Sequence, residues 1–221
     1  MKVIISGYGR MGHMVESVLL ERGIEIAGRS EDVCATDPAL ARECVCIDFT
    51  TPDAFKANYR FLAANFKAVV IGTTGWEDIR EEVIAEFKAH GTTMIYSSNF
   101  SIGVNAMFAA VQKVSSVLRG HGYVPHIEET HHIHKLDAPS GTAKTLAAIV
   151  SDGLGVTPDI TSIREGEVPG IHVVKFKSEV DKIKISHEAF SRQGLAEGAV
   201  VAALMTEKCD GVHEFKEILL G

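Results

Sequence analysis

The chain has 221 residues, 46% of them hydrophobic, which is enough for two small domains with separate cores. Its formal net charge of −7 disfavours a nucleic-acid partner, because proteins that bind DNA or RNA are usually basic. The sequence has no apolar run of about 18 residues and no secretory signal pattern, so we expect no membrane partner and a cytoplasmic location.

The first predicted element is a short buried strand at residues 3–5, followed by a glycine-rich turn and a helix. The turn has GxGxxG spacing and reads Gly7-Tyr8-Gly9-Arg10-Met11-Gly12. The helix that follows has an apolar face made by Met11, Val15, Val18 and Leu19. In a dinucleotide-binding domain the glycines let the pyrophosphate approach the backbone, and the helix N-terminus supplies N–H donors. We therefore predict that the residues of this turn bind a dinucleotide.

The second predicted strand, at residues 24–28, leads into the position that selects the cofactor. Arg29 and Ser30 follow it and could hold the 2′-phosphate of NADPH. Glu31 or Asp32 could instead bind the ribose of NADH if the turn is one residue longer. We predict that NADPH is preferred and that NADH is also used.

Further strands are predicted at residues 44–49, 68–71 and 93–96, with helices between them. Ligands of open α/β sheets bind at the carboxyl ends of the strands, and each of these strands ends in small or hydroxylated residues. The cofactor site is thus expected to include Phe49, Gly72, Thr73, Thr74, Ser97, Ser98, Asn99 and Phe100. The four cysteines form no CxxC pair, and we expect buried thiols rather than disulfides or zinc ligands.

The regular alternation of strand and helix stops near Asn99. A helix is predicted at residues 104–118, and extended segments at 123–132, 172–176 and 182–186 are no longer evenly separated by helices. The expected fold class is α/β, with a Rossmann-type doubly wound parallel domain and a second, α+β domain built on a mixed sheet. The predicted boundaries assign residues 1–99 and 193–221 to the first domain and residues 100–192 to the second.

Residues 131–142, HHIHKLDAPSGT, place three histidines and a lysine before a turn. On a strand, His132 and His134 would share one face and His131 would lie on the other. Ser140 is expected to cap the following helix, so that Gly141 and Thr142 present backbone N–H groups at its start. Cationic side chains beside a helix N-terminus suit a small dianion. A histidine next to a lysine can also act as a general acid near neutral pH.

Two other interpretations of this stretch stay open. The histidines could bind a metal together with Glu128 or Glu129, although the cation of Lys135 would repel the ion and no HExxH spacing is present. They could also be surface histidines without a role. We expect no metal.

The same stretch resembles the signature of the 4-hydroxy-tetrahydrodipicolinate reductase (dihydrodipicolinate reductase) family, roughly E-x-H-H-x-x-K-x-D-A-P-S-G-T-A. The similarity extends over nearly the whole chain, in a short form of the family, and includes the segments Asp48-Phe49-Thr50, Gly72–Gly75 and Asn99–Ser101. It implies an oxidoreductase of diaminopimelate and lysine biosynthesis. In that reaction NAD(P)H delivers a hydride to C4 of a cyclic imine dicarboxylate, and a proton is added at C3.

The resemblance also implies roles for single residues. His131 and Lys135 would be catalytic, and His132, Gly141 and Thr142 would bind the substrate. The second domain would hold together a homotetramer. Two alternatives remain open at this stage, another NAD(P)-dependent dehydrogenase of a small dicarboxylate or amino acid and a non-catalytic NADPH sensor.

Overall fold

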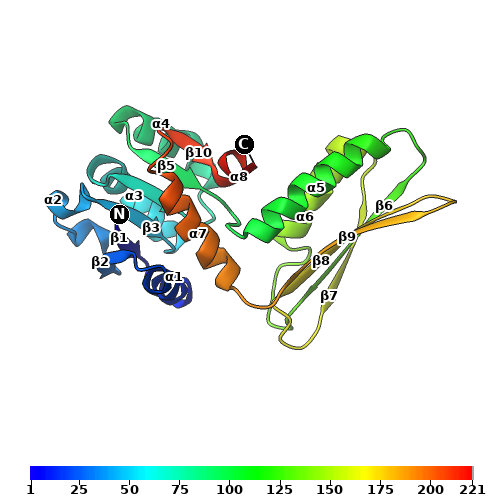
Figure 1. Ribbon diagram of the computed structural model, residues 1–221, viewed down its shortest axis with the longest axis horizontal. Coiled ribbons are helices and arrows are strands. Elements are labelled where there is room, and N and C mark those ends of the chain that lie inside the picture. Colours follow the sequence, from blue (N-terminus) through cyan, green and yellow to red (C-terminus); the bar gives the residue numbers. More distant parts are fainter. Residues whose placement is uncertain (221) are drawn as a thin grey trace. The chain divides into compact units, whose positions relative to one another are not determined.

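The computed structural model describes residues 1–220, which form two compact units (Figure 1). One unit consists of Met1–Ser101 and the segment that begins at Leu195, and the other is Ile102–Gly194. The sequence-based boundaries lay after residues 99 and 192.

The first unit is a six-stranded sheet in which every described strand pair is parallel. The strand order is β10-β5-β4-β3-β1-β2. The strands are β1 (Lys2–Ser6), β2 (Glu25–Ser30), β3 (Cys44–Asp48), β4 (Ala68–Ile71), β5 (Thr93–Tyr96) and β10 (Val212–Glu214). The helices are α1 (Arg10–Glu21), α2 (Pro38–Ala41), α3 (Pro52–Asn65), α4 (Arg80–His90), α7 (Gln193–Met205) and α8 (Phe215–Leu220), with short 3-10 turns η1 (Val33–Ala35) and η2 (Glu77–Ile79). This arrangement confirms the predicted doubly wound parallel domain.

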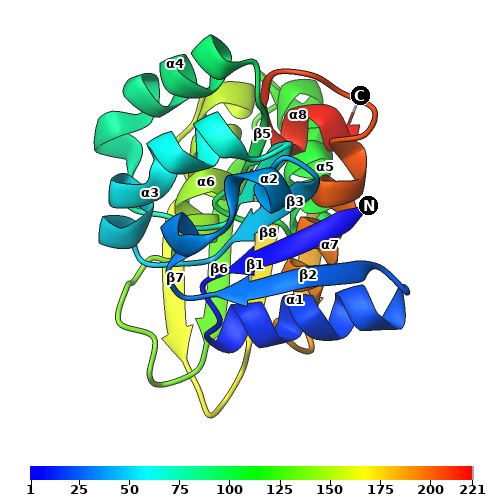
Figure 2. The same ribbon diagram turned by 90° about the vertical axis from the view of Figure 1, so that its left-hand side faces the viewer.

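Both faces of this sheet are covered by helices, which explains why its strands are nearly continuous apolar runs (Figures 1 and 2). In β1, for example, Val3 and Ile5 face α1 and α7, whereas Ile4 faces the other way. The first core includes Val15 from α1, and the second includes Phe55 from α3. The period-two alternation of the strands thus builds two apolar layers on one sheet.

The second unit has a four-stranded mixed sheet in the order β7-β6-β8-β9. Its elements are α5 (Ile102–Leu118), β6 (Val124–His131), α6 (Gly141–Leu154), β7 (Asp159–Arg164), β8 (Gly170–Lys177) and β9 (Lys182–Ala189). β6 is parallel to β7 and antiparallel to β8, and β8 is antiparallel to β9. Val111 of α5 and Leu146 of α6 pack against one face of the sheet at residues such as Val174. The predicted mixed-sheet domain is confirmed.

Three expectations about local structure were wrong. β6 ends at His131, so His132 and His134 lie in a turn rather than on one face of a strand. The strands β7 and β10 were not predicted. Cys34 is exposed, although Cys44 and Cys46 are buried as expected. Within residues 1–220, no helix is long and apolar enough to cross a membrane.

Candidate active site

The glycine turn between β1 and α1 is packed tightly on one side and open on the other. Gly7 has a φ of +83°, and a Cβ there would lie 2.3 Å from the carbonyl oxygen of Phe49. A Cβ at Gly12 would lie 2.4 Å from the carbonyl oxygen of Gly7, whereas a Cβ at Gly9 would meet no described atom within 4 Å. Gly9 is also the N-cap of α1, whose start has no side-chain cap among the described residues. An open backbone turn at a helix N-terminus fits the pyrophosphate of a dinucleotide.

Asp48, the last residue of β3, ties together the carboxyl ends of three strands. Its buried carboxylate accepts hydrogen bonds from Ser6 Oγ at 2.7 Å, Thr73 Oγ1 at 2.6 Å and Thr50 Oγ1 at 3.0 Å. Burial raises the pKa of Asp48, and these hydrogen bonds only partly offset that effect. Sequence reasoning did not select Asp48, although an acidic residue that ends an apolar strand is a signal for such a role.

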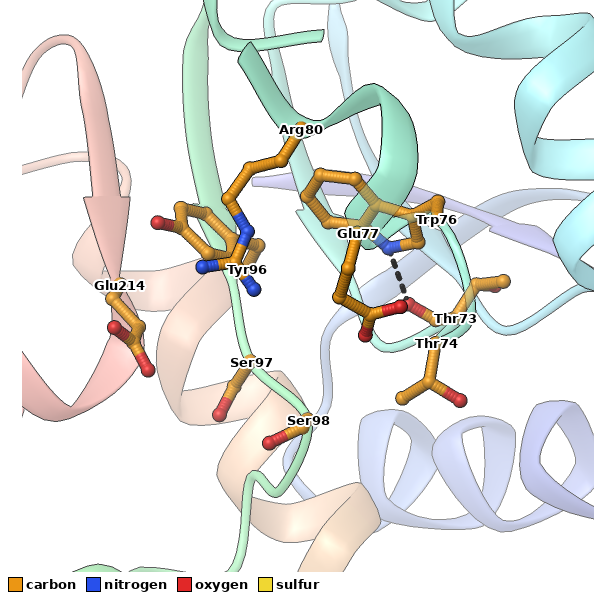
Figure 3. A pocket seen from close by; sticks show the side chains of 9 residues that line it. All are labelled: Thr73, Thr74, Trp76, Glu77, Arg80, Tyr96, Ser97, Ser98 and Glu214. Atoms are coloured by element: carbon orange, nitrogen blue, oxygen red, sulfur yellow. Dashed lines mark hydrogen bonds between the residues drawn. The ribbon is translucent and has the colours of Figure 1, made fainter. Parts of the chain in front are cut away.

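A small pocket lies at the carboxyl ends of β4 and β5 (Figure 3). It contains four of the predicted cofactor residues, Thr73, Thr74, Ser97 and Ser98. Its other lining residues are Trp76, Glu77, Arg80, Tyr96 and Glu214. The indole Nε1 of Trp76 donates to the carbonyl oxygen of Thr73 at 2.7 Å, which fixes the loop after β4.

The aromatic and glycine members of the predicted cofactor set are tightly packed against each other. A Cβ at Gly72 would lie 2.1 Å from the ring of Phe49, so position 72 needs glycine for that ring to fit. The ring of Phe49 lies 6.3 Å from that of Phe100, edge to face. Phe100 is buried in the same core, and the side-chain carbonyl of Asn99 accepts a hydrogen bond from the backbone N–H of Ser101.

The end of β2 brings a cation next to the glycine turn. The guanidinium of Arg29 lies 6.0 Å from the ring of Tyr8, and the backbone carbonyl of Ser30 accepts from Gly7 N at 2.9 Å. Arg29 is also paired with Glu16 of α1, which in turn accepts a hydrogen bond from the hydroxyl of Tyr8. A 2′-phosphate at Arg29 would therefore compete with a carboxylate that the sequence analysis did not anticipate.

In the second unit, the segment from His131 to the start of α6 collects charged groups. Lys135 Nζ pairs with Asp137 Oδ1 at 2.7 Å, and its side chain is about a quarter exposed. Ser140 caps α6 as predicted, because its Oγ accepts from Ala143 N at 3.2 Å. Gly141 and Thr142 are the first two residues of that helix. Lys135 and the helix start thus belong to one short, defined segment.

His132 and His134 have separate partners in the turn. His132 Nε2 lies 3.3 Å from Arg192 Nη2, and His134 Nε2 lies 2.9 Å from Glu167 Oε1. Their rings are 5.9 Å apart. Arg192 was not among the predicted site residues, because its contact with His132 spans 60 positions of the sequence.

Glu129 of β6 lies at the centre of a buried polar cluster whose members Arg164 and His172 were not predicted as site residues. Its Oε1 accepts from the backbone N–H of Ser140 and from Arg164 Nη2, both at 3.1 Å. Its Oε2 lies 3.2 Å from His131 Nδ1 and 4.0 Å from His172 Nε2. Ser140 Oγ in turn lies 3.3 Å from His172 Nε2. Glu129, His131 and His172 come from alternate positions of two paired strands, which puts them on one face.

The cluster has a defined charge state at neutral pH. Burial alone would raise the pKa of Glu129, but hydrogen bonds from Ser140, Ser162 and Arg164 outweigh it and lower this pKa to about 2. Burial lowers the pKa of His172 to about 4, with a contribution from His131. Burial also lowers the pKa of His131. The carboxylate is therefore ionised and both imidazoles are neutral.

We expect the free energy of unfolding to fall as the pH drops below about 6.5. The pKa of His172 is depressed from 6.5 to about 4, so the unfolded chain takes up a proton in this window that the folded chain does not. This uptake stabilises the unfolded chain, so the free energy of unfolding is lower by roughly 3 kcal/mol at pH 4 than at neutral pH. The pKa values of His131 and His187 are lowered as well, which adds to this effect. The depressed pKa of Glu129 lowers the free energy of unfolding further between pH 4.5 and about 2.

Denaturant unfolding at pH 7.5 and pH 5 measures this loss. His172→Asn should remove part of the slope, whereas replacing the exposed His121 should leave it intact. Equal stability of the unmodified protein at both pH values would contradict the assigned protonation states.

Glu129, His131 and His172 also place three potential ligand atoms within 4.8 Å of one another. This set shares Glu129 and His131 with the metal site considered in the sequence, but has His172 in place of His132 and His134. Arg164 already binds the carboxylate, and the charge of Lys135 acts on His131. Positive charge on two sides disfavours a divalent cation and favours an anionic ligand nearby.

A parallel dinucleotide-type domain and a second domain with a cationic, capped helix start are typical of two-domain oxidoreductases. Two protein-family models match the chain. The family "Dihydrodipicolinate reductase, N-terminus" matches residues 1–100, and the family "Dihydrodipicolinate reductase, C-terminus" matches residues 103–219. The chain belongs to the dihydrodipicolinate reductase family.

Individual relatives agree with this assignment. The chain is 39% identical to the 4-hydroxy-tetrahydrodipicolinate reductase of Christiangramia forsetii, with 99% of the chain and 98% of the relative covered. It is 33% identical to that of Ralstonia nicotianae, with 99% of each covered. The fold is similar to that of dipicolinate-bound dihydrodipicolinate reductase from Paenisporosarcina sp. TG-14, with a TM-score of 0.82, 20% identity and 99% of each chain covered.

Proposed function

We propose that the chain reduces 4-hydroxy-tetrahydrodipicolinate to tetrahydrodipicolinate with NAD(P)H, a step of diaminopimelate and lysine biosynthesis. The observation that carries this proposal is the segment from His131 to Thr142, where a buried imidazole, a lysine and a capped helix start lie within 12 residues. That combination suits a small dicarboxylate. Membership of the reductase family supports the same substrate.

The substrate is held by charge and by directed donors. Lys135 and His132 bind its carboxylates, together with the backbone of Gly141 and Thr142 at the start of α6. The ammonium of Lys135 is only partly neutralised by Asp137, so it keeps an attraction for a dianion. These contacts orient the ring for reaction, which is the larger part of what a protein contributes to cofactor chemistry.

Protonation is the task of His131 and Lys135. When bound, the nicotinamide supplies a hydride for C4 of the ring, and the reduction is complete when C3 gains a proton. The hydroxyl of the substrate leaves as water. Burial keeps His131 neutral in the free protein, and a bound dianion raises its pKa because opposite charge favours the imidazolium. His131 then becomes an effective acid only when substrate is present.

The cofactor would be held by the first unit. The turn Gly7–Gly12 would bind its pyrophosphate, and Phe49, Gly72–Thr74 and Ser97–Phe100 would line the rest of the site. NADPH is preferred through Arg29 and Ser30, and NADH is also accepted, because Glu16 already neutralises part of the charge of Arg29.

Two substitutions test this cofactor preference. Arg29→Ala should raise the Kd for NADPH by roughly tenfold and leave that for NADH nearly unchanged, since a charge-assisted contact is worth about 1.5–3 kcal/mol. Glu16→Gln should shift the preference further towards NADPH by freeing Arg29. Fluorescence titration with both cofactors measures these changes. Equal losses for NADPH and NADH in Arg29→Ala would remove the basis for the preference.

The assembly is a homotetramer held together by the second unit. α5 and α6 cover one face of its sheet, and the other face, which carries the exposed Ile163, has no helix on it among the described elements of this unit. Light scattering should give a mass about four times the 23.9 kDa of one chain. A monomer mass would rule this assembly out.

Absorbance of the reduced nicotinamide tests the activity itself. The substrate is generated in the cuvette from pyruvate and aspartate semialdehyde by the preceding synthase, with NADPH or NADH in parallel. Enzyme-dependent loss of absorbance that requires the synthase is the expected result. A folded protein that binds NADPH but shows no loss would favour a nucleotide sensor or a dehydrogenase of another small dianion.

A further inference from the structure

The carboxylate of Glu129 is fully buried, and its two oxygens have different neighbours. Oε1 accepts from Ser140 and Arg164, whereas Oε2 has no hydrogen-bond partner within residues 1–220. His131 Nδ1, 3.2 Å from Oε2, also lacks one within the described chain. We propose that Glu129 is a positioning residue, which holds His131 through Nδ1 and leaves Nε2 as the nitrogen that transfers the proton. This inference rests on the proposed function, in which His131 is an acid.

The first step of the argument is the pairing of the two buried atoms. A buried donor or acceptor without a partner costs about 1–3 kcal/mol, so such atoms are rarely left unpaired in folded proteins. Oε2 and Nδ1 lie 3.2 Å apart, which is within hydrogen-bond distance. An ionised carboxylate is acceptor-only, so the pairing requires the proton on Nδ1. The hydrogen bond at one ring nitrogen fixes the tautomer and thereby the role of the other.

The second step is that Glu129 itself cannot move. Arg164 and the backbone of Ser140 fix Oε1, and both hydrogen bonds are buried or partly buried. Glu129 and His131 are two residues apart on β6, so they project from the same face of the strand. The rigid strand therefore sets the distance between the carboxylate and the imidazole.

The third step is the space around Nε2. A Cβ at Gly170 of β8 would lie 3.1 Å from His131 Nε2 and 3.3 Å from its Cδ2. Any larger residue at this position would press on the side of the ring that the proposal assigns to proton transfer. Glycine keeps that side clear while the ring of His172 packs 5.1 Å away.

Glu129 also links the imidazole to the other catalytic group. Arg164, held by Glu129, donates to the backbone carbonyls of Lys135 at 3.3 Å and Asp137 at 2.6 Å. One buried carboxylate thus fixes His131 directly and fixes the backbone of Lys135 through Arg164. This shared support fixes the positions of His131 and Lys135 relative to the start of α6.

Kinetics of Glu129→Gln test the positioning role. An amide can present its NH₂ group to Nδ1 and reverse the tautomer, so kcat should fall by on the order of 100-fold, the usual contribution of a positioned acid. The KM for substrate should change by less than about threefold. Glu129→Asp should recover part of kcat. The matched control is Glu128→Gln, because Glu128 is adjacent in sequence, lies on the other face of β6 and pairs with Lys175.

The pH profile separates positioning from a purely structural defect. The charged or titratable groups that face His131 are Glu129 on β6, Lys135 and Asp137 in the turn, Arg164 on β7 and His172 on β8. Loss of the Glu129 charge leaves burial and two cations to act on the ring, so the apparent pKa of the acid in kcat should move to lower pH. Unchanged thermal melting and NADPH affinity in Glu129→Gln would show that the fold persists.

A second readout does not depend on activity. Long-range ¹H–¹⁵N NMR of labelled histidines, with His131→Asn for assignment, should show His131 with its proton on Nδ1 in the unmodified protein. Glu129→Gln should change that tautomer. Wild-type His131 protonated on Nε2, or a Gln variant with unchanged kcat and pH profile, would overturn the proposal. Failure of the unmodified protein to reduce the substrate would instead overturn the proposed function, and the tautomer result would still stand.

Discussion

Lys135→Ala is expected to lower turnover by at least about 100-fold, the loss seen when one preorganised charge or donor is removed from an active site. The change removes the ammonium and leaves the carboxylate of Asp137, its partner at 2.7 Å, to face a dianionic substrate. Cofactor affinity should change by less than about twofold, because every predicted cofactor residue lies in the first unit. Steady-state kinetics and NADPH titration measure the two effects separately.

Lys177→Ala is the control for this loss, since Lys177 is an exposed lysine at the far end of β8 from Gly170. It should keep normal kinetics. Near-normal turnover in Lys135→Ala would show that Lys135 neither binds nor protonates the substrate, and the assignment of the site would then rest on His131 alone.

Gly198→Ala should destabilise the first unit by about 3 kcal/mol or more. A Cβ at Gly198 would lie 1.7 Å from the carbonyl oxygen of Phe100 and 2.7 Å from its carbon. Both are backbone atoms, so a side-chain rotation cannot relieve the overlap, and α7 must move away from the core. The gain of about 1 kcal/mol from alanine in a helix is too small to compensate.

Chemical denaturation compares this variant with Gly28→Ala, whose added Cβ would lie 3.6 Å from Ile4 Cγ1 in ordinary contact. Gly28→Ala should change stability by less than about 1 kcal/mol. Equal stability of Gly198→Ala and the unmodified protein would mean that α7 and Phe100 are less closely packed than the structure has them.

The first unit could be predicted because its signals are local. The GxGxxG spacing at Gly7–Gly12 and the apolar strands around Val3 and Val70 follow from short stretches of sequence. β10 was not predicted because three residues are too few to show the alternation of apolar and polar side chains that marks a strand. The segment is extended because it pairs with β5. β7 was missed for a related reason, since its exposed, polar residues become a strand only beside β6.

The site could be predicted only in part. The family signature marked His131 and Lys135, but all three histidines were expected on a strand. The structure separates them, because β6 ends at His131 and the backbone then turns, with Lys135 N donating to His132 O at 3.2 Å. His131 is buried, whereas His134 lies at the surface. Where a strand ends depends on its neighbours, which sequence period alone does not show.

The buried cluster around Glu129 was beyond sequence reasoning for a different reason. Its members come from β6, β7 and β8, up to 43 positions apart between Glu129 and His172. Each residue by itself is an ordinary polar residue in a strand. The sequence did offer signals for Glu129, which is the first residue of the family signature and, on a strand, shares a face with His131.

The central claim is that this chain directs a hydride to C4 of a cyclic dicarboxylate. The most direct test is the fate of deuterium from NADPH dideuterated at C4 of the nicotinamide, with substrate made in place by the synthase. Mass spectrometry and ¹H NMR should find one deuterium at C4 of tetrahydrodipicolinate. A reduced product without deuterium at C4, or no reduced product from a folded protein that binds NADPH, would contradict the account.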